Sequence, residues 1–126
     1  MRLERLAEAA NSFRRAIALE PDSATAHVGL AQVHKLGASP DEALAELEAA
    51  LELDPGNADA HYTRAIIYRD LGELELEIEA LESTTAVDPG NSLAQSRLAD
   101  IRLANGDYQG AIAALKAALV GRTTVE

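Results

Sequence analysis

A proline recurs at a fixed interval along this 126-residue chain. Pro21, Pro55 and Pro89 are each separated by 34 residues. The flanking residues agree as well, since Leu-Glu-Pro-Asp-Ser, Leu-Asp-Pro-Gly-Asn and Val-Asp-Pro-Gly-Asn surround the three prolines in turn. Self-similarity at a period of about 20–50 residues is the signature of repeat architectures. The chain is therefore expected to fold as a row of similar units.

Each unit is predicted to contain two helices. A residue that favours helix N-caps follows each proline, and these residues are Ser23, Asn57 and Asn91. A glycine then ends the first helix, where it can take the left-handed C-cap conformation, at Gly37, Gly72 and Gly106. The second helix stops before the next proline. The predicted helices span residues 2–20, 24–36, 40–53, 58–71, 74–87, 92–105 and 108–120.

The first complete unit has two local peculiarities. Gly37 comes one residue early relative to the other two glycines, which predicts a shorter helix and a longer turn. The segment from Ser39 to Glu42 is expected to begin the next helix. Ser39 would cap it, Pro40 would occupy the first helical position, and Glu42 would close a capping box.

Composition supports a purely helical fold and excludes several functions. Aromatic residues make up only 3% of the chain, whereas strands are enriched in aromatic and β-branched residues. The net charge of −10 disfavours nucleic acid as a partner, because phosphate binding needs a basic surface. No apolar run approaches the ~18 residues of a membrane span. The first residues read as a helix rather than a secretory signal, and the chain has no cysteine, so a cytoplasmic location is expected.

The spacing resembles that of the tetratricopeptide repeat (TPR) family. Its pattern has a small residue at repeat position 8, Gly-x-aromatic before the second helix, alanine at 20 and 27, a large apolar residue at 24 and proline at 32. The run from Gly106 through Tyr108 to Ala111 fits this pattern. Small residues fill position 8 in phase, at Ala31, Ala65 and Ala99. Large apolar residues fill position 24, at Phe13, Leu47, Leu81 and Leu115.

The resemblance implies an all-α fold, a right-handed α-solenoid of antiparallel helix pairs with about 3.5 repeats in seven helices. Residues 1–126 would form a single domain. Its predicted parts are a half repeat that holds only a second helix (1–23), three repeats (24–57, 58–91 and 92–121) and a tail (122–126). Tyr68 and Tyr108 occupy positions that are core positions in the family, and both are expected to pack inside.

Several residues depart from the family pattern. The position usually held by tryptophan carries His27, His61 and Gln95. In the middle repeat, Arg64 stands where leucine is usual and Glu77 where alanine is usual. These two positions lie on facing helices in the family, so we hypothesise that Arg64 and Glu77 form a partly buried ion pair. Losing one partner alone would leave a stranded charge.

By analogy with the family, the chain is expected to be a non-catalytic scaffold that binds a peptide or partner protein in a concave groove lined by the first helices. The resemblance places the predicted contacts at Val28, Gln32, Lys35, Tyr62, Ile66, Arg69, Arg97 and Asp100. Of the positions needed for the chaperone-type carboxylate clamp, only Arg97 matches, so that clamp is not expected. A mixed apolar and polar segment is the expected ligand.

No catalytic, cofactor or metal site is expected. The three histidines occupy packing positions, and a zinc site needs three or four converging ligands. None of the many carboxylates has a nucleophile, a phosphate-binding loop or a partner histidine beside it.

The two ends of the predicted solenoid leave alternatives open. Solenoids normally have terminal caps with a polar outer face, and neither end of this chain has an obvious one. Two explanations are therefore expected to compete, an excised piece of a longer TPR protein and a homo-oligomer in which the uncapped terminal helices pair with other copies. Two alternative functions follow, a self-assembling structural module and a TPR segment of a larger enzyme such as a transferase.

Overall fold

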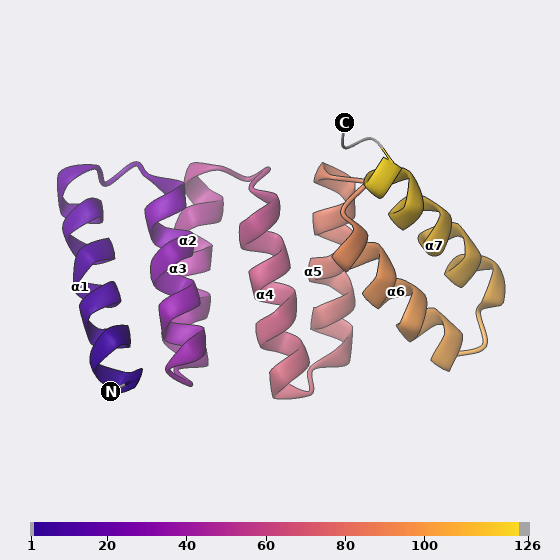
Figure 1. The fold of residues 1–126 in the computed structure, drawn as a ribbon, viewed down its shortest axis with the longest axis horizontal. Helices are drawn as coiled ribbons and strands as arrows, with labels where there is room; N and C mark the ends of the chain where they lie inside the picture. The colour runs from indigo at the N-terminus through magenta and orange to yellow at the C-terminus, as the bar shows by residue number, and fades with distance from the viewer. Residues whose placement is uncertain (1, 124–126) are drawn as a thin grey trace.

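The helices follow one another in a single array (Figure 1). The computed structural model describes residues 2–123, and within that range it contains helices and no strand. The helices are α1 (Arg2–Leu19), α2 (Ala24–Leu36), α3 (Pro40–Leu53), α4 (Ala58–Leu71), α5 (Leu74–Val87), α6 (Ser92–Ala104) and α7 (Tyr108–Thr123). The predicted helix boundaries are confirmed within three residues. The predicted tail lies partly in α7, and its residues 124–126 fall outside the described part of the chain.

The predicted N-caps of the first helices are confirmed. The side-chain oxygens of Ser23, Asn57 and Asn91 each accept a hydrogen bond from the backbone N–H three residues later, at 3.1, 2.9 and 3.0 Å. Each bond satisfies one of the donors that a helix N-terminus leaves unpaired. The proline turns therefore start α2, α4 and α6 in the same way, and this repetition sets the pitch of the array.

The turn after α2 corrects the prediction for its glycine. Gly72 and Gly106 have φ of 76° and 79° and take the expected left-handed conformation. Gly37 has φ of −84°, and the left-handed residue is Ala38, with φ of 58°. Ala38 is the residue that corresponds to the other two glycines in the 34-residue register. Because a Cβ disfavours this conformation, the early glycine leaves the turn strained.

The start of α3 corrects a second local prediction. Pro40 is at the first helical position as expected, but the Ser39 side chain makes no capping hydrogen bond. The Glu42 carboxylate instead lies 3.6 Å from Nδ1 of His34 on the preceding helix. The capping box prediction is therefore wrong, because Glu42 turns toward a histidine on α2.

Small residues allow the helices to pack closely. The position-8 alanines are at most 1% exposed, and they are Ala31, Ala65 and Ala99. Large side chains fill the space between them, including Leu47 and Leu81, which are 0% and 1% exposed. At Thr84 a hydroxyl replaces the usual alanine, and it donates a 2.8 Å hydrogen bond to the carbonyl of Ala80, so its burial leaves no polar atom unpaired.

The outer face of α7 remains uncovered in the described structure. Leu115 corresponds to Leu47 and Leu81, yet it is 44% exposed. Tyr108, which was expected to pack inside, is 64% exposed, whereas Tyr68 is half-buried against the core as predicted. The Tyr108 prediction is wrong because no helix packs against this face of α7, as Figure 1 shows at the end of the array.

Candidate functional site

The first helices α2, α4 and α6 carry all of the predicted groove residues. Gln32, Arg69 and Asp100 are exposed. Lys35, Tyr62, Ile66 and Arg97 are half-buried. Val28 is only 6% exposed and belongs to the core between α2, α3 and α4, so it is not available to a ligand. Tyr62 also packs on its inner side against the core around Leu81 and Leu98.

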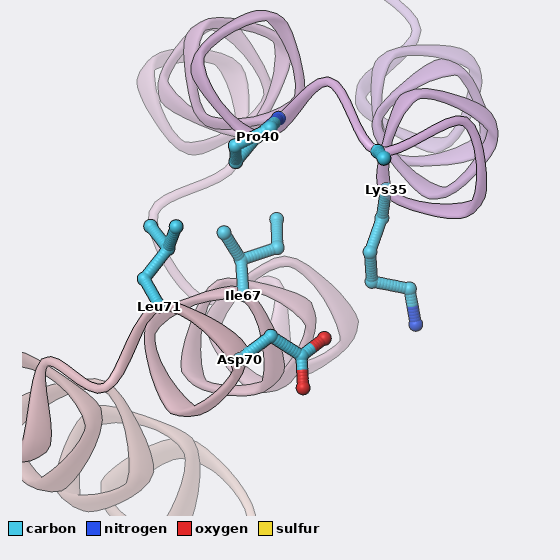
Figure 2. A pocket seen from close by; sticks show the side chains of 6 residues that line it. Lys35, Pro40, Ile67, Asp70 and Leu71 are labelled. Carbon is cyan, nitrogen blue, oxygen red and sulfur yellow. The ribbon is translucent and has the colours of Figure 1, made fainter.

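A cavity of about 320 Å³ lies where the C-terminal ends of α2 and α4 meet the start of α3. Figure 2 shows Ile67 and Leu71 of α4 projecting toward Pro40 of α3, with Lys35 of α2 at one side. The Asp70 carboxylate points toward the same side as Lys35 (Figure 2). The site thus combines an apolar floor with one cation and one anion at its rim. A pocket with an apolar lining and few polar groups is the usual character of a binding site.

The strained turn helps to form this cavity. Ala38 is one of the lining residues, and only Ser39 separates its left-handed backbone from Pro40. Lys35 forms no ion pair among the described residues. Asp70 instead pairs with its neighbour Arg69, at 3.9 Å. The Lys35 ammonium is therefore free to meet a negative group of a ligand.

The groove changes character between α4 and α6. Helix α2 packs directly on α4, whereas α4 and α6 share little contact. In Figure 1, α6 and α7 incline away from α4 and α5. Glu77 of α5 and Arg97 of α6 join the two parts. Arg97 Nε donates to one Glu77 oxygen at 2.6 Å, and Nη2 donates to the other at 2.9 Å.

This pair corrects the predicted ion pair of the middle repeat. Glu77 is 2% exposed, and its partner is Arg97 rather than Arg64. Glu77 is buried and Arg64 is half-buried, as the hypothesis expected, but Glu77 pairs with a residue of the next repeat. A two-pronged arginine–carboxylate contact is among the strongest charged hydrogen bonds. The hydrogen bond to Glu77 raises the pKa of Arg97 above its ordinary value, and this effect outweighs the opposite effect of burial.

Arg64 is left without a carboxylate. Its Nη2 donates to Nδ1 of His61 at 3.1 Å, while its Nε is buried with no hydrogen-bond partner. A buried donor without an acceptor costs about 1–3 kcal/mol. Sequence reasoning missed this because the repeat spacing alone does not decide whether Glu77 pairs with Arg64 or with Arg97.

The residues at the tryptophan position play a structural role. His61 Nε2 and Gln95 Nε2 both donate, at 2.9 Å, to the carbonyl of the proline six residues earlier. His27 instead contacts Glu46 through Nδ1, at 2.7 Å. The expectation that no carboxylate has a histidine beside it is therefore wrong. These hydrogen bonds connect α4 and α6 to the turns that precede them, and α2 to α3. Among the described residues no group of three or more His, Cys, Asp or Glu is placed to hold a metal ion.

Comparison with known families decides the identity of the fold. A model described as tetratricopeptide repeat matches residues 37–86 and 78–124, and one described as TPR repeat matches residues 1–37. The chain belongs to the tetratricopeptide repeat family. No curated protein matches this TPR chain closely enough to serve as a relative. In the part of the chain that the structure describes, no helix is both long and apolar enough to cross a membrane.

Solved structures share the same solenoid. The crystal structure of MamA superposes with a TM-score of 0.80 at 26% identity, covering 94% of this chain and 70% of that one. MamA 41-end from Desulfovibrio magneticus RS-1 gives 0.75 at 23% identity over 99% of this chain and 71% of that one. A chain in the crystal structure of the APC/C hetero-tetramer Cut9–Hcn1 gives 0.80 at 22%, over 98% and 24%. This all-α TPR solenoid is thus a protein-interaction scaffold of a family that is typically non-catalytic.

Proposed function

We propose that this TPR domain binds an extended segment of a partner protein along the groove of its first helices, with the cavity beside Ile67 as the main contact. An apolar side chain of the segment enters between Pro40 and Leu71. A neighbouring carboxylate of the segment pairs with Lys35, and Asp70 accepts a backbone N–H. The observation that carries the proposal is the cavity of about 320 Å³ with its unpaired lysine.

The surrounding charges support this choice of ligand. The chain carries a net charge of −10, so a strongly acidic ligand would be repelled at most of its surface. Within the cavity rim, Lys35 and Asp70 offer one charge of each sign. A segment with an apolar residue beside a single acidic residue matches this rim, and opposite charges at a rim favour the correct register of binding.

Arg97 contributes to this function indirectly. Its guanidinium is held by Glu77, so it sets the position of α6 rather than meeting the ligand. Removing Arg97 would disturb the fold together with binding, and it is therefore a poor test residue. Lys35 and Leu71 are better test residues, because Leu71 is 48% exposed and Lys35 has no partner to lose.

A peptide-display selection on the immobilised domain tests the proposal. Wild-type protein is expected to enrich peptides that hold a leucine-sized residue next to Asp or Glu. Lys35→Glu should lose this enrichment. Lys116→Glu makes the same charge change on the exposed side of α7 and should keep it. Identical enrichment on wild type and Lys35→Glu would show that ligands bind elsewhere.

The exposed face of α7 favours a second candidate, self-association. Its apolar side chains are 44–64% exposed, and they are Tyr108, Ile112, Leu115, Leu119 and Val120. Contiguous exposed apolar residues of this kind often mark protein contacts. Light scattering after size-exclusion chromatography is expected to show a dimer for wild type and a monomer for Leu119→Glu. A monomer at every concentration up to about 1 mM would exclude this candidate.

A further inference from the structure

A second cavity lies between the second helix α3 and the first helix α4 of the next repeat, and the half-buried Arg64 lines it. Arg64 of α4 occupies the register position of Leu30 and Leu98, which are 3% and 2% exposed core residues in the other two repeats. The middle repeat therefore places a guanidinium where its neighbours place a core leucine. A charge in such a position is costly unless it is paired.

The intramolecular contacts of Arg64 do not neutralise it. His61 Nε2 lies 2.9 Å from the carbonyl of Pro55, which can only accept, so Nε2 carries the proton. In the neutral imidazole, Nδ1 is then the acceptor for Arg64 Nη2 at 3.1 Å. No carboxylate of the described residues lies within 4 Å of Arg64, and its Nε is buried without an acceptor.

Arg64 lines a cleft of about 460 Å³ between α3 and α4. Half-buried Leu44, Leu51 and Tyr68 line the cleft with apolar surface, and the exposed Glu48 and Glu52 stand at its rim. An adjoining hollow of about 50 Å³ continues from Arg64 toward α5, where Glu79 is exposed. The cleft thus has a cationic floor, apolar walls and an acidic rim.

We propose that this cleft binds a carboxylate side chain of a partner protein segment in which apolar and basic residues flank the acidic one. The carboxylate pairs with the Arg64 guanidinium, which lines the cleft. The apolar neighbours contact Leu44 and Leu51. The basic neighbours meet Glu48, Glu52 and Glu79 at the rim.

The charges around the cleft exclude two simpler ligands. A segment that is only basic would match the rim but would bring a second cation against Arg64. A segment that is only acidic would match the floor but would be repelled by three glutamates as it approached. A segment in which an acidic residue lies between apolar and basic residues matches both the cationic floor and the acidic rim. This interaction is independent of the groove described above, since the two cavities share no lining residue.

The peptide acetyl-Lys-Leu-Glu-Leu-Lys-amide tests the proposal, with its Glu→Gln version as the matched ligand. Binding is measured by calorimetry, and the Nε–H signal of Arg64 is followed by NMR. The Glu peptide is expected to bind saturably and to shift this signal. The Gln peptide should bind at least about tenfold more weakly, because it loses a charged hydrogen bond.

Two variants separate binding from folding. Arg64→Leu restores the residue of the other two repeats, so it should melt no lower than wild type while losing binding of the Glu peptide. Arg15→Leu makes the same change at an exposed position on α1 and should bind as wild type does. The proposal is overturned if the Glu peptide does not bind below about 5 mM, if the Gln peptide binds equally well, or if Arg64→Leu retains full affinity.

Discussion

The ring of Phe13 occupies the space that a side chain at Gly29 would fill. A Cβ built on Gly29 would overlap three ring carbons of Phe13, and Gly29 itself lies in the buried face of α2. The glycine is thus explained by packing, since its backbone conformation is that of an ordinary helix. Elsewhere in the register the Phe13 position holds leucine, at Leu47 and Leu81.

Gly29→Ala is therefore expected to destabilise the protein even though alanine favours helices. Over-packing of this kind costs about 1–3 kcal/mol. Adding Phe13→Leu should restore part of the loss, because the smaller side chain makes room for the new methyl group. Urea unfolding of the two single variants and the double variant measures the coupling. Strict additivity would contradict the contact between these residues.

Arg97→Met should destabilise the protein by about 3 kcal/mol, because it leaves the carboxylate of Glu77 buried without its partner. The double variant Glu77→Ala with Arg97→Met removes both charges and restores the alanine found at Ala43 and Ala111. It should recover most of the stability. The exposed Arg15→Met serves as the control and should change the unfolding free energy by less than about 0.5 kcal/mol.

The pH dependence of the Arg97 contribution follows from the sign of its pKa shift. The folded-state pKa of Arg97 is raised, first by the hydrogen bonds that its guanidinium donates to Glu77. The corresponding stability is complete below the unfolded-state value and is lost only as the pH rises through the folded-state value. The difference in unfolding free energy between wild type and Arg97→Met should thus stay constant from about pH 7 to about pH 10. A difference that shrinks within this range would contradict the assignment.

Ala38→Gly should stabilise the protein by about 0.5–1 kcal/mol, because the strain of a left-handed alanine exceeds the extra entropy of an unfolded glycine. Gly72 has φ of 76°, so the opposite substitution, Gly72→Ala, should destabilise the protein by a similar amount. Gly37→Ala should cause little change, since Gly37 has φ of −84°. The melting temperatures of the three variants check these expectations. A melting temperature of Ala38→Gly below that of wild type, or of Gly72→Ala above it, would contradict the strain at Ala38.

Local signals explain why the helix boundaries could be predicted. Pro55 with Asn57, and Pro89 with Asn91, combine a helix stop with a helix start within three residues, so the ends do not depend on tertiary contacts. The C-cap of α2 could not be predicted as well, because Gly37 and Ala38 are adjacent and the left-handed position is decided by the 34-residue register.

The candidate site was less predictable because it depends on neighbours distant in the sequence. Val28 has the register of a groove residue, yet α3 and α4 cover it. Tyr108 has the register of a core residue, but the described structure has no further helix to bury it. Glu77 could have paired with either arginine, and only the placement of α6 decides for Arg97. Positions in a repeat predict which helix a residue belongs to better than they predict what it contacts.

A charge-reversal experiment on Lys35 tests most directly whether the cavity beside Ile67 is the ligand site. The affinity of a peptide selected on wild type is measured by calorimetry, together with its variant in which the acidic residue is replaced by lysine. Lys35→Glu is predicted to bind the first peptide about tenfold more weakly than wild type does, because two carboxylates then face each other. It should bind the second peptide better than wild type does, because the exchanged charges again form an opposite pair. If Lys35→Glu binds both peptides as wild type does, the ligand does not contact this cavity.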